Sequence, residues 1–113
     1  MIIGHTAEFS GIFFGNGKCN EYCNLGAVVV GEAVDFGAGT ACGNHRFDSE
    51  PPTIRIKGRA YRPPQMSVGG YFGDYCRTGV NAMIMPGVRV GPYSIVGPGL
   101  CSTKTLRRGS WPL

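Results

Sequence analysis

The chain has 113 residues and a formal net charge of +4, from 11 Lys and Arg against 7 Asp and Glu. Its 19 Gly and 8 Pro are poor helix formers and argue against a helical bundle. Charged residues make up 16% of the chain, below the average of about 25% for soluble domains. We therefore expect one domain, residues 1–113, with part of its surface packed against another copy.

The N-terminal residues, the apolar runs and the cysteines indicate in which compartment the protein is expected. The start, from Met1 to His5, lacks the basic and apolar regions of a secretory signal, and no apolar run approaches the roughly 18 residues of a membrane span. We expect a cytoplasmic protein without membrane attachment. The 5 cysteines are irregularly spaced, without a C-x-x-C pair, which favours buried thiols over a disulfide framework. A metal site from Cys19, Cys23 and His45 is the alternative, and we expect no metal.

Between residues 72 and 101 the sequence divides into consecutive groups of six residues. With one exception each group opens with a hydrophobic residue, the second residue is usually Gly, and the fifth is small or aliphatic. The openings are Phe72, Thr78, Ile84, Val90 and Val96. This period is typical of a left-handed parallel β-helix, in which each six forms a short strand and a turn, and three of them form a triangular coil. The opening residue should point inward, and Gly should supply backbone freedom at the turn.

The same pattern continues upstream with some five-residue steps. The openings there are Ile3, Phe9, Phe14, Asn20, Leu25, Val30 and Phe36. The predicted fold class is therefore an all-β, left-handed parallel β-helix of about four to five coils. Because each coil of such a short stack contacts only its neighbours, we expect a homotrimer of prisms packed by their flat faces.

The repeat is lost between residues 42 and 71. This segment is polar and basic, and two Pro-Pro pairs, at 51–52 and 63–64, bracket an alternating stretch at 53–57. Proline cannot donate to a strand ladder, so we predict an extruded loop with a short hairpin-like strand that reaches a neighbouring subunit. Residues 102–113 are predicted to form a C-terminal tail.

Several motifs follow one another in a characteristic order: residues 30–40, ending in Gly-Ala-Gly-Thr40; Asn44-x-Arg46-x-Asp48; Lys57-Gly58-Arg59; and residues 73–87, which contain Thr78-Gly-Val-Asn81. In this order they resemble the C-terminal β-helix domain of sugar-1-phosphate nucleotidylyltransferases. Some of those enzymes are bifunctional and also transfer an acetyl group from acetyl-CoA to an amino-sugar phosphate. The resemblance covers residues 3–99. Because Met1 lies beside the first repeat, we expect no nucleotidylyltransferase domain here, and a separate nucleotidylyltransferase chain is an expected partner.

The resemblance implies an acyltransferase whose base is the His of a His-x-x-Tyr-x-Gly-Asp motif. In this sequence Glu21 stands at the His position, Asn24 at the Tyr position and Ala27 at the Asp position. Glu21 is therefore one candidate base. His45, beside Asn44, is the other, since imidazole is the natural base near neutral pH. The departures from the motif favour an alternative function, a β-helix without catalysis that serves trimerisation or ligand binding.

The resemblance also implies an acceptor site. Asn24, Asn44 and Arg46 are the candidate substrate-binding residues, because an amide can orient a sugar hydroxyl or amine and Arg can pair with a phosphate. The implied acceptor is an amino-sugar phosphate or a similar small polar molecule.

The last third of the chain is basic. No acidic residue follows Asp74, whereas five Lys and Arg residues do. This charge suits the phosphates of CoA, and the resemblance implies acetyl-CoA as cosubstrate, held between subunits. Nucleic acid is not expected, because the aromatic residues here form no stacking motif. The candidate cofactor-binding residues are Thr78, Asn81, Lys104, Arg107 and Arg108.

Overall fold

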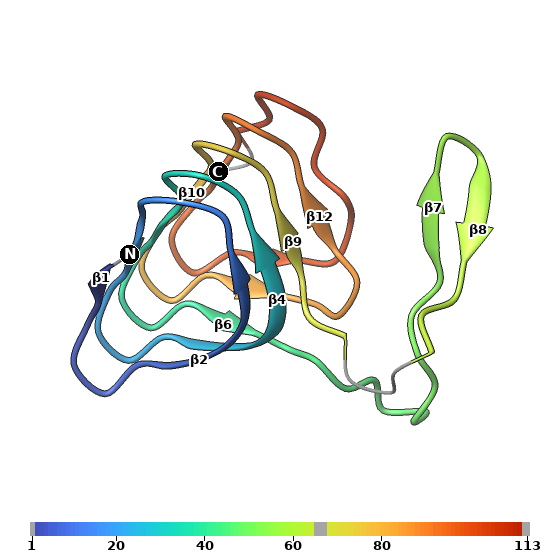
Figure 1. Ribbon diagram of the computed structural model, residues 1–113, viewed down its shortest axis with the longest axis horizontal. Helices are drawn as coiled ribbons and strands as arrows, with labels where there is room; N and C mark the ends of the chain where they lie inside the picture. The colour runs from blue at the N-terminus through green and yellow to red at the C-terminus, as the bar shows by residue number, and fades with distance from the viewer. Residues whose placement is uncertain (1, 65–67, 112–113) are drawn as a thin grey trace.

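The computed structural model describes residues 2–64 and 68–111, and within them every regular element is a β-strand. Short strands stack in parallel into a triangular prism, with an excursion standing apart from it (Figure 1). In the described ranges there is no helix long and apolar enough to cross a membrane. The predicted all-β, parallel β-helix fold is confirmed.

The prism has three faces. Face A stacks β1 (Ile2–Ile3), β3 (Lys18–Cys19), β5 (Asp35–Phe36), β10 (Arg77–Thr78) and β13 (Ile95–Val96). Face B stacks the first halves of β2 (Glu8–Phe13) and β4 (Asn24–Val30) with β6 (Ala41–Cys42), β11 (Met83–Ile84) and β14 (Cys101–Ser102). Face C stacks the second halves of β2 and β4 with β9 (Tyr71–Phe72), β12 (Arg89–Val90) and a bridge from Val90 to Leu106. Five strands on face A mean five coils, within the predicted number.

The second residue of each two-residue strand faces the inside of the prism, and all of these residues are buried except Ile3 of the first coil, which is 49% exposed. The predicted hexapeptide openings between residues 72 and 101 are all buried, which confirms the inward register there. Upstream the predicted register is wrong at two positions: Phe13 and Cys19 face the core, whereas Phe14 is 72% exposed and Asn20 is half-buried. The reason is an irregularity in the β2–β4 ladder between Phe9 and Gly11, which displaces the following residues by one.

The corners of the prism use glycine differently from the prediction. Positive φ falls on the fourth residue of each six, including Tyr75 (61°), Asn81 (58°) and Tyr93 (60°). Gly at the second position instead permits close approach of coils. A Cβ on Gly79 would lie 2.6 Å from the backbone nitrogen of Pro98 in the next coil. The predicted role of the second-position Gly in turn freedom is therefore wrong.

The excursion leaves face B after Cys42 and rejoins face C at Tyr71. It carries an antiparallel hairpin of β7 (Ile54–Ile56) and β8 (Arg59–Tyr61), which Figure 1 shows standing away from the prism. The predicted extruded loop is thus present. Its contact with a neighbouring subunit stays a prediction.

Most of the predicted C-terminal tail continues the β-helix, with its backbone hydrogen-bonded to the preceding coil. The N–H of Leu106 donates to the Arg89 carbonyl at 2.8 Å, and the N–H of Gly109 donates to the Pro92 carbonyl at 2.8 Å. The backbone ladder therefore extends the prism to Ser110, whose carbonyl accepts from Ile95. Residues 112 and 113 lie outside the described part.

Candidate functional site

A cavity of about 760 Å³ lies where the excursion leaves the prism. Its size falls in the range of small-molecule sites, about 300 to 1,000 Å³. One wall is apolar and comes from both the excursion and the fourth coil, and the other carries an imidazole and an ion pair. The lining residues are Gly43, His45, Arg46, Phe47, Asp48, Pro52, Thr53, Met85 and Pro86. His45 and Arg46, two of the predicted site residues, are thus brought together.

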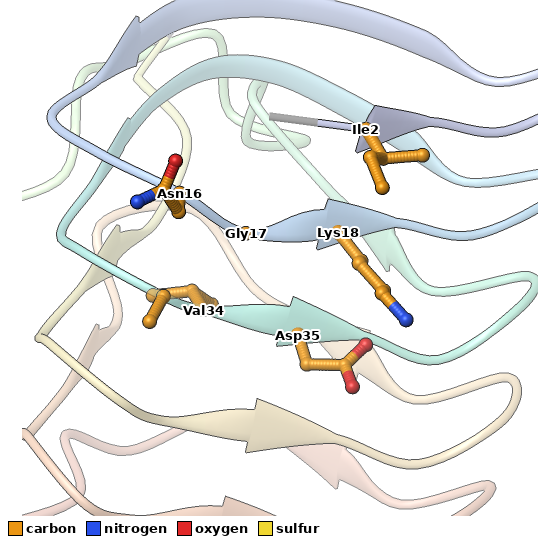
Figure 2. Close-up of a pocket in the computed structure, with 7 residues that line it drawn as sticks. Ile2, Asn16, Gly17, Lys18, Val34 and Asp35 are labelled. Carbon is orange, nitrogen blue, oxygen red and sulfur yellow. The ribbon is translucent and has the colours of Figure 1, made fainter.

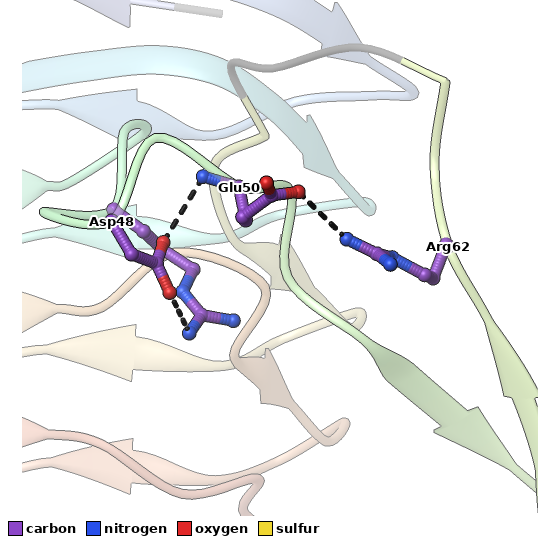
Figure 3. A network of polar contacts seen from close by, with 4 residues as sticks. Asp48, Glu50 and Arg62 are labelled. Atoms are coloured by element: carbon purple, nitrogen blue, oxygen red, sulfur yellow. Dashed lines mark hydrogen bonds and ion pairs between the residues drawn. The ribbon is translucent and has the colours of Figure 1, made fainter.

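A polar network holds the rim of this cavity (Figure 3). Arg46 Nη2 donates to Asp48 Oδ2 at 2.6 Å, and Asp48 Oδ1 accepts from the backbone N–H of Glu50 at 3.0 Å. Arg62 Nη2 donates to Glu50 Oε2 at 2.9 Å, which ties the rim to the end of the hairpin. Both ion pairs are largely exposed, so they fix the loop's shape more than they stabilise the fold.

Asn44 is anchored at the corner between faces B and C. Its carbonyl accepts from the N–H of Val68 at 2.9 Å, which closes the excursion at its base. Its side chain lies over Gly26, where a Cβ would come within 2.5 Å of Asn44 Nδ2. Gly26 is therefore the residue that admits the Asn44 amide to this corner.

Glu21 and Asn24 occupy the other side of face B. Glu21 is exposed at the corner between faces A and B, where its backbone carbonyl accepts from Gly39 N–H at 2.9 Å. Asn24 opens β4 and lies on the outer surface of face B, next to Ala41 in the ladder. Glu21 does not line the His45 cavity. Within one chain the two candidate bases therefore lie at opposite edges of face B.

Four of the five basic residues of the last third line one of two cavities, and Arg77 lines neither. Arg107 and Arg108 line a cavity of about 340 Å³ on face C together with Arg89. Lys104 lines another, of about 270 Å³, beyond β14. Arg89 joins the predicted pair because its outward position in β12 places it beside the fifth coil. Sequence reasoning counted its charge but missed its location.

Thr78 and Asn81, also predicted to bind the cofactor, differ in their placement. The Thr78 side chain points into the prism, 2.8 Å from the Thr40 hydroxyl, and it accepts from the N–H of Gly37. The Thr78 hydroxyl therefore forms its hydrogen bonds inside the core and does not lie on the outer surface of the prism. Asn81 is exposed at the corner between faces A and B.

Four of the five thiols are buried, as predicted, whereas Cys101 is exposed. Burial raises the pKa of Cys19 and Cys76 to about 12 and that of Cys42 to about 11. Cys23 is buried beside Cys19, whereas His45 lies on the excursion. Among the described residues no three His, Cys, Asp or Glu side chains are grouped to hold a metal ion.

A further cavity lies on the first coils of face A, away from all of these residues. Figure 2 shows Lys18 and Asp35 side by side along it, with Asn16 at one end. Its volume is about 360 Å³, and none of the predicted site residues lines it.

The fold places the chain among the parallel β-helix proteins, and it adds a surface excursion with a ligand-sized cavity. The fold is shared with two sugar acetyltransferases. One is a mutant perosamine N-acetyltransferase from Caulobacter crescentus in complex with CoA and GDP-perosamine (TM-score 0.60, 18% identity, 97% of this chain and 45% of that one). The other is a maltose O-acetyltransferase from Clostridium difficile (TM-score 0.59, 20% identity, 96% and 51%).

Sequence comparison is more specific. The chain is 34% identical over 110 residues to a bifunctional sugar-1-phosphate nucleotidylyltransferase/acetyltransferase from Sulfurisphaera tokodaii, covering 96% of this chain and 27% of that protein. It is also 34% identical to the bifunctional protein GlmU from Methanococcus vannielii, with 96% and 26% covered. A scan against models of known protein families finds no match. The chain is thus a homologue of these bifunctional proteins and spans about a quarter of their length, which confirms the resemblance.

Proposed function

We propose that this chain is an acyl-CoA-dependent acyltransferase that moves an acetyl group from acetyl-CoA to an amino sugar or amino-sugar phosphate. The observation that carries the proposal is the cavity in which His45 stands between an apolar wall, which includes Met85, and the Arg46–Asp48 pair. Homology to bifunctional acetyltransferases supports the reaction class.

The chemistry needs one base. The acceptor amine attacks the thioester carbonyl, so a C–N bond forms while the C–S bond breaks. The proton leaves the amine for the imidazole of His45, and CoA departs as a thiolate that takes up a proton. His45 fits this role better than Glu21, because His45 lines the cavity and Glu21 lies exposed at another corner. Asn44, beside His45 in the chain, would orient the acceptor.

The donor would be held by the basic end of the prism. Arg107 and Arg108 line one cavity of face C, where guanidinium groups can pair with the phosphates of CoA. Lys104 would add charge nearby, and Asn81 would face a neighbouring copy. A relative of this fold has been seen with CoA bound, which supports the choice of cosubstrate.

The site would be completed by a homotrimer. Asn24 and Glu21 lie at one side of face B, and Asn44 and His45 lie at the other, so only a second copy can bring the two sets across a groove. Exposed apolar side chains such as Ile12 supply surface for such packing. Sedimentation velocity should give a trimer, and a monomer at micromolar concentration would contradict this. We further propose a cytoplasmic location, a separate nucleotidylyltransferase chain as partner, and no nucleic-acid or membrane partner.

Two observations favour the second candidate, a β-helix that binds ligand or trimerises without turnover. The Arg46 guanidinium is engaged by Asp48 at 2.6 Å, and Glu21 stands where related acetyltransferases are expected to have their His. Binding of CoA without product formation would establish this candidate.

Acetyl transfer to a panel of amino-sugar 1-phosphates, followed by mass spectrometry of the product, tests the proposal. His45→Ala should lower the turnover rate by about 100-fold or more, the range for loss of a general base. His5→Ala, which alters the exposed histidine of the first coil, is the matched control and should leave the rate unchanged. If Glu21→Gln abolishes transfer and His45→Ala does not, the base is assigned wrongly.

A further inference from the structure

A second cavity beside the excursion, of about 380 Å³, is lined by residues of the hairpin and of face C. We propose that this cavity binds a nucleoside diphosphate, so that the acceptor sugar is carried on a nucleotide. That the bound nucleotide carries the acceptor sugar rests on the proposed function. That the cavity binds a nucleoside diphosphate is argued from the cavity alone.

Most residues that line the cavity are apolar or aromatic, which suits an aromatic ring. Ile54, Ile56 and Tyr61 of the hairpin line one side, and Tyr71 of face C lines the other. In the hairpin ladder Ile54 pairs with Tyr61 and Ile56 pairs with Arg59, whose guanidinium lies 5.8 Å from the centre of the Tyr61 ring. Arg55 pairs with Ala60 on the opposite side. Because side chains alternate along a strand, the hairpin turns the face with Ile54, Ile56 and Tyr61 to the cavity and its Arg55 face away. Aromatic side chains are the groups on which nucleobases stack in other proteins.

Two guanidinium groups line the same cavity. Arg89 comes from β12, where it is the ladder neighbour of Tyr71, and Arg62 comes from the end of the hairpin. Arg89 makes no ion pair with any residue in the described ranges, and Arg62 has one exposed partner, Glu50. No Asp or Glu occurs between residues 51 and 73. Arginine binds phosphate oxygens in a two-pronged manner, so the pair suits a diphosphate.

The lining also disfavours a bare sugar. The residues of this cavity include no carboxylate and no carboxamide, which are the groups that bind sugar hydroxyls with direction. Rings, aliphatic side chains and guanidinium groups instead match the base and the diphosphate of a nucleotide.

The position of the cavity links it to His45. Pro52 lines the His45 cavity and Ile54 lines the second one, so the two cavities share the segment 52–54 as a wall. That wall is fixed against the prism, because a Cβ on Gly87 would lie 2.7 Å from Pro52 and 3.9 Å from Ile54. A sugar joined to a diphosphate on one side of this wall can extend towards the imidazole on the other.

Calorimetry with UDP and GDP at low salt, where phosphate contacts are strongest, tests the nucleotide end. Both should bind, and Arg62→Gln, Arg89→Gln and Tyr61→Ala should each weaken binding by about tenfold, the loss of one charge-assisted contact or one stacking partner. Arg55→Gln removes the same charge from the opposite face of the same hairpin and should leave binding unchanged. Unfolding curves of all four variants establish that the fold is retained.

The inference is overturned if neither nucleotide binds, whether or not CoA binds there, or if Arg55→Gln weakens binding as much as Arg62→Gln. If Tyr61→Ala dissociates the oligomer and no nucleotide binds, the cavity is an interface between copies and the inference is also wrong.

A transfer assay separates this inference from the proposed function. Acetyl transfer to a nucleotide-linked amino sugar should exceed transfer to the matching amino-sugar 1-phosphate, and Arg62→Gln should remove that preference. Transfer without nucleotide binding would overturn the inference and leave the acyltransferase in place. Nucleotide binding without any transfer would overturn the acyltransferase and leave the binding site.

Discussion

The prism and the excursion differ in how their residues are held. In the prism each inward side chain stacks on the equivalent residue of the next coil, as Cys19, Phe36 and Thr78 do on face A. In the excursion few side chains are buried, and the exceptions, such as Pro52 and Ile54, lie where it meets the prism. The prism therefore supplies the stability, and the excursion, with a cavity on each side of its base, carries the proposed sites.

The largest effect should come from exchanging a phenylalanine in each region. Phe36 is fully buried and meets Phe72 edge to face at 4.8 Å, whereas Phe47 is fully exposed at the rim of the His45 cavity. Phe36→Ala should lower the free energy of unfolding by about 4 kcal/mol. Phe47→Ala should change it by less than about 0.5 kcal/mol. Equilibrium denaturation measures both, and equal losses would contradict the division of roles.

Glycine should give the next effect, for a different reason in each region. Gly79→Ala should cost about 2 kcal/mol, because the new methyl meets the next coil. Gly58, at the hairpin tip, has open space around it but a φ of +77°, so Gly58→Ala should cost about 1 kcal/mol of backbone strain. Asn tolerates this conformation. Gly58→Asn should therefore recover stability, while Gly79→Asn should lose more than Gly79→Ala; the reverse order would contradict the assignment.

The buried thiols predict a pH dependence of the prism. The folded-state pKa of Cys76 is raised to about 12 from the ordinary 9.0 by burial, so the unfolded chain loses its proton first. The stability contributed by the neutral thiol is thus present below pH 9 and is lost as pH rises towards 12. For Cys76 the loss between pH 9 and pH 11 is about 2 kcal/mol.

Denaturation curves of the wild type and Cys76→Ala at these two pH values check this prediction. The variant should lose less stability between them, although its stability at pH 7 is lower. An equal loss in both proteins would show that other groups carry the alkaline destabilisation.

Much of the fold could be predicted because in a solenoid the same pattern of inward residues repeats in every coil. The spacing of Phe72, Ile84 and Val90 is enough to predict which residues point inward. The pattern misled at Phe14 because neighbouring aromatic residues, Phe13 and Phe14, both satisfy it. A ladder irregularity upstream, which no periodicity encodes, decided between them.

Less of the site could be predicted. Spacing placed His45 and Arg46 on the excursion, and the structure gives them a shared cavity. Arg89 and Tyr61 line one cavity although nearly thirty residues of chain separate them, because the hairpin and face C both contribute to its walls. No local motif encodes a cavity shared in this way. The acid-free run from 51 to 73 was the available signal for it.

The smallest effect on stability should come from the surface ion pairs, and here function should separate the two regions. Arg77–Asp35 on the prism and Arg46–Asp48 on the excursion are both largely exposed, so Arg77→Gln and Arg46→Gln should each change the free energy of unfolding by less than about 1 kcal/mol. Arg46 lines the His45 cavity and Arg77 does not. Arg46→Gln should therefore raise KM for a phosphorylated acceptor by about tenfold, the worth of one charge-assisted contact, and leave KM for the unphosphorylated amine unchanged. Arg77→Gln should alter neither. If Arg46→Gln raises KM for both acceptors equally, its guanidinium shapes the loop through Asp48 and does not bind the phosphate.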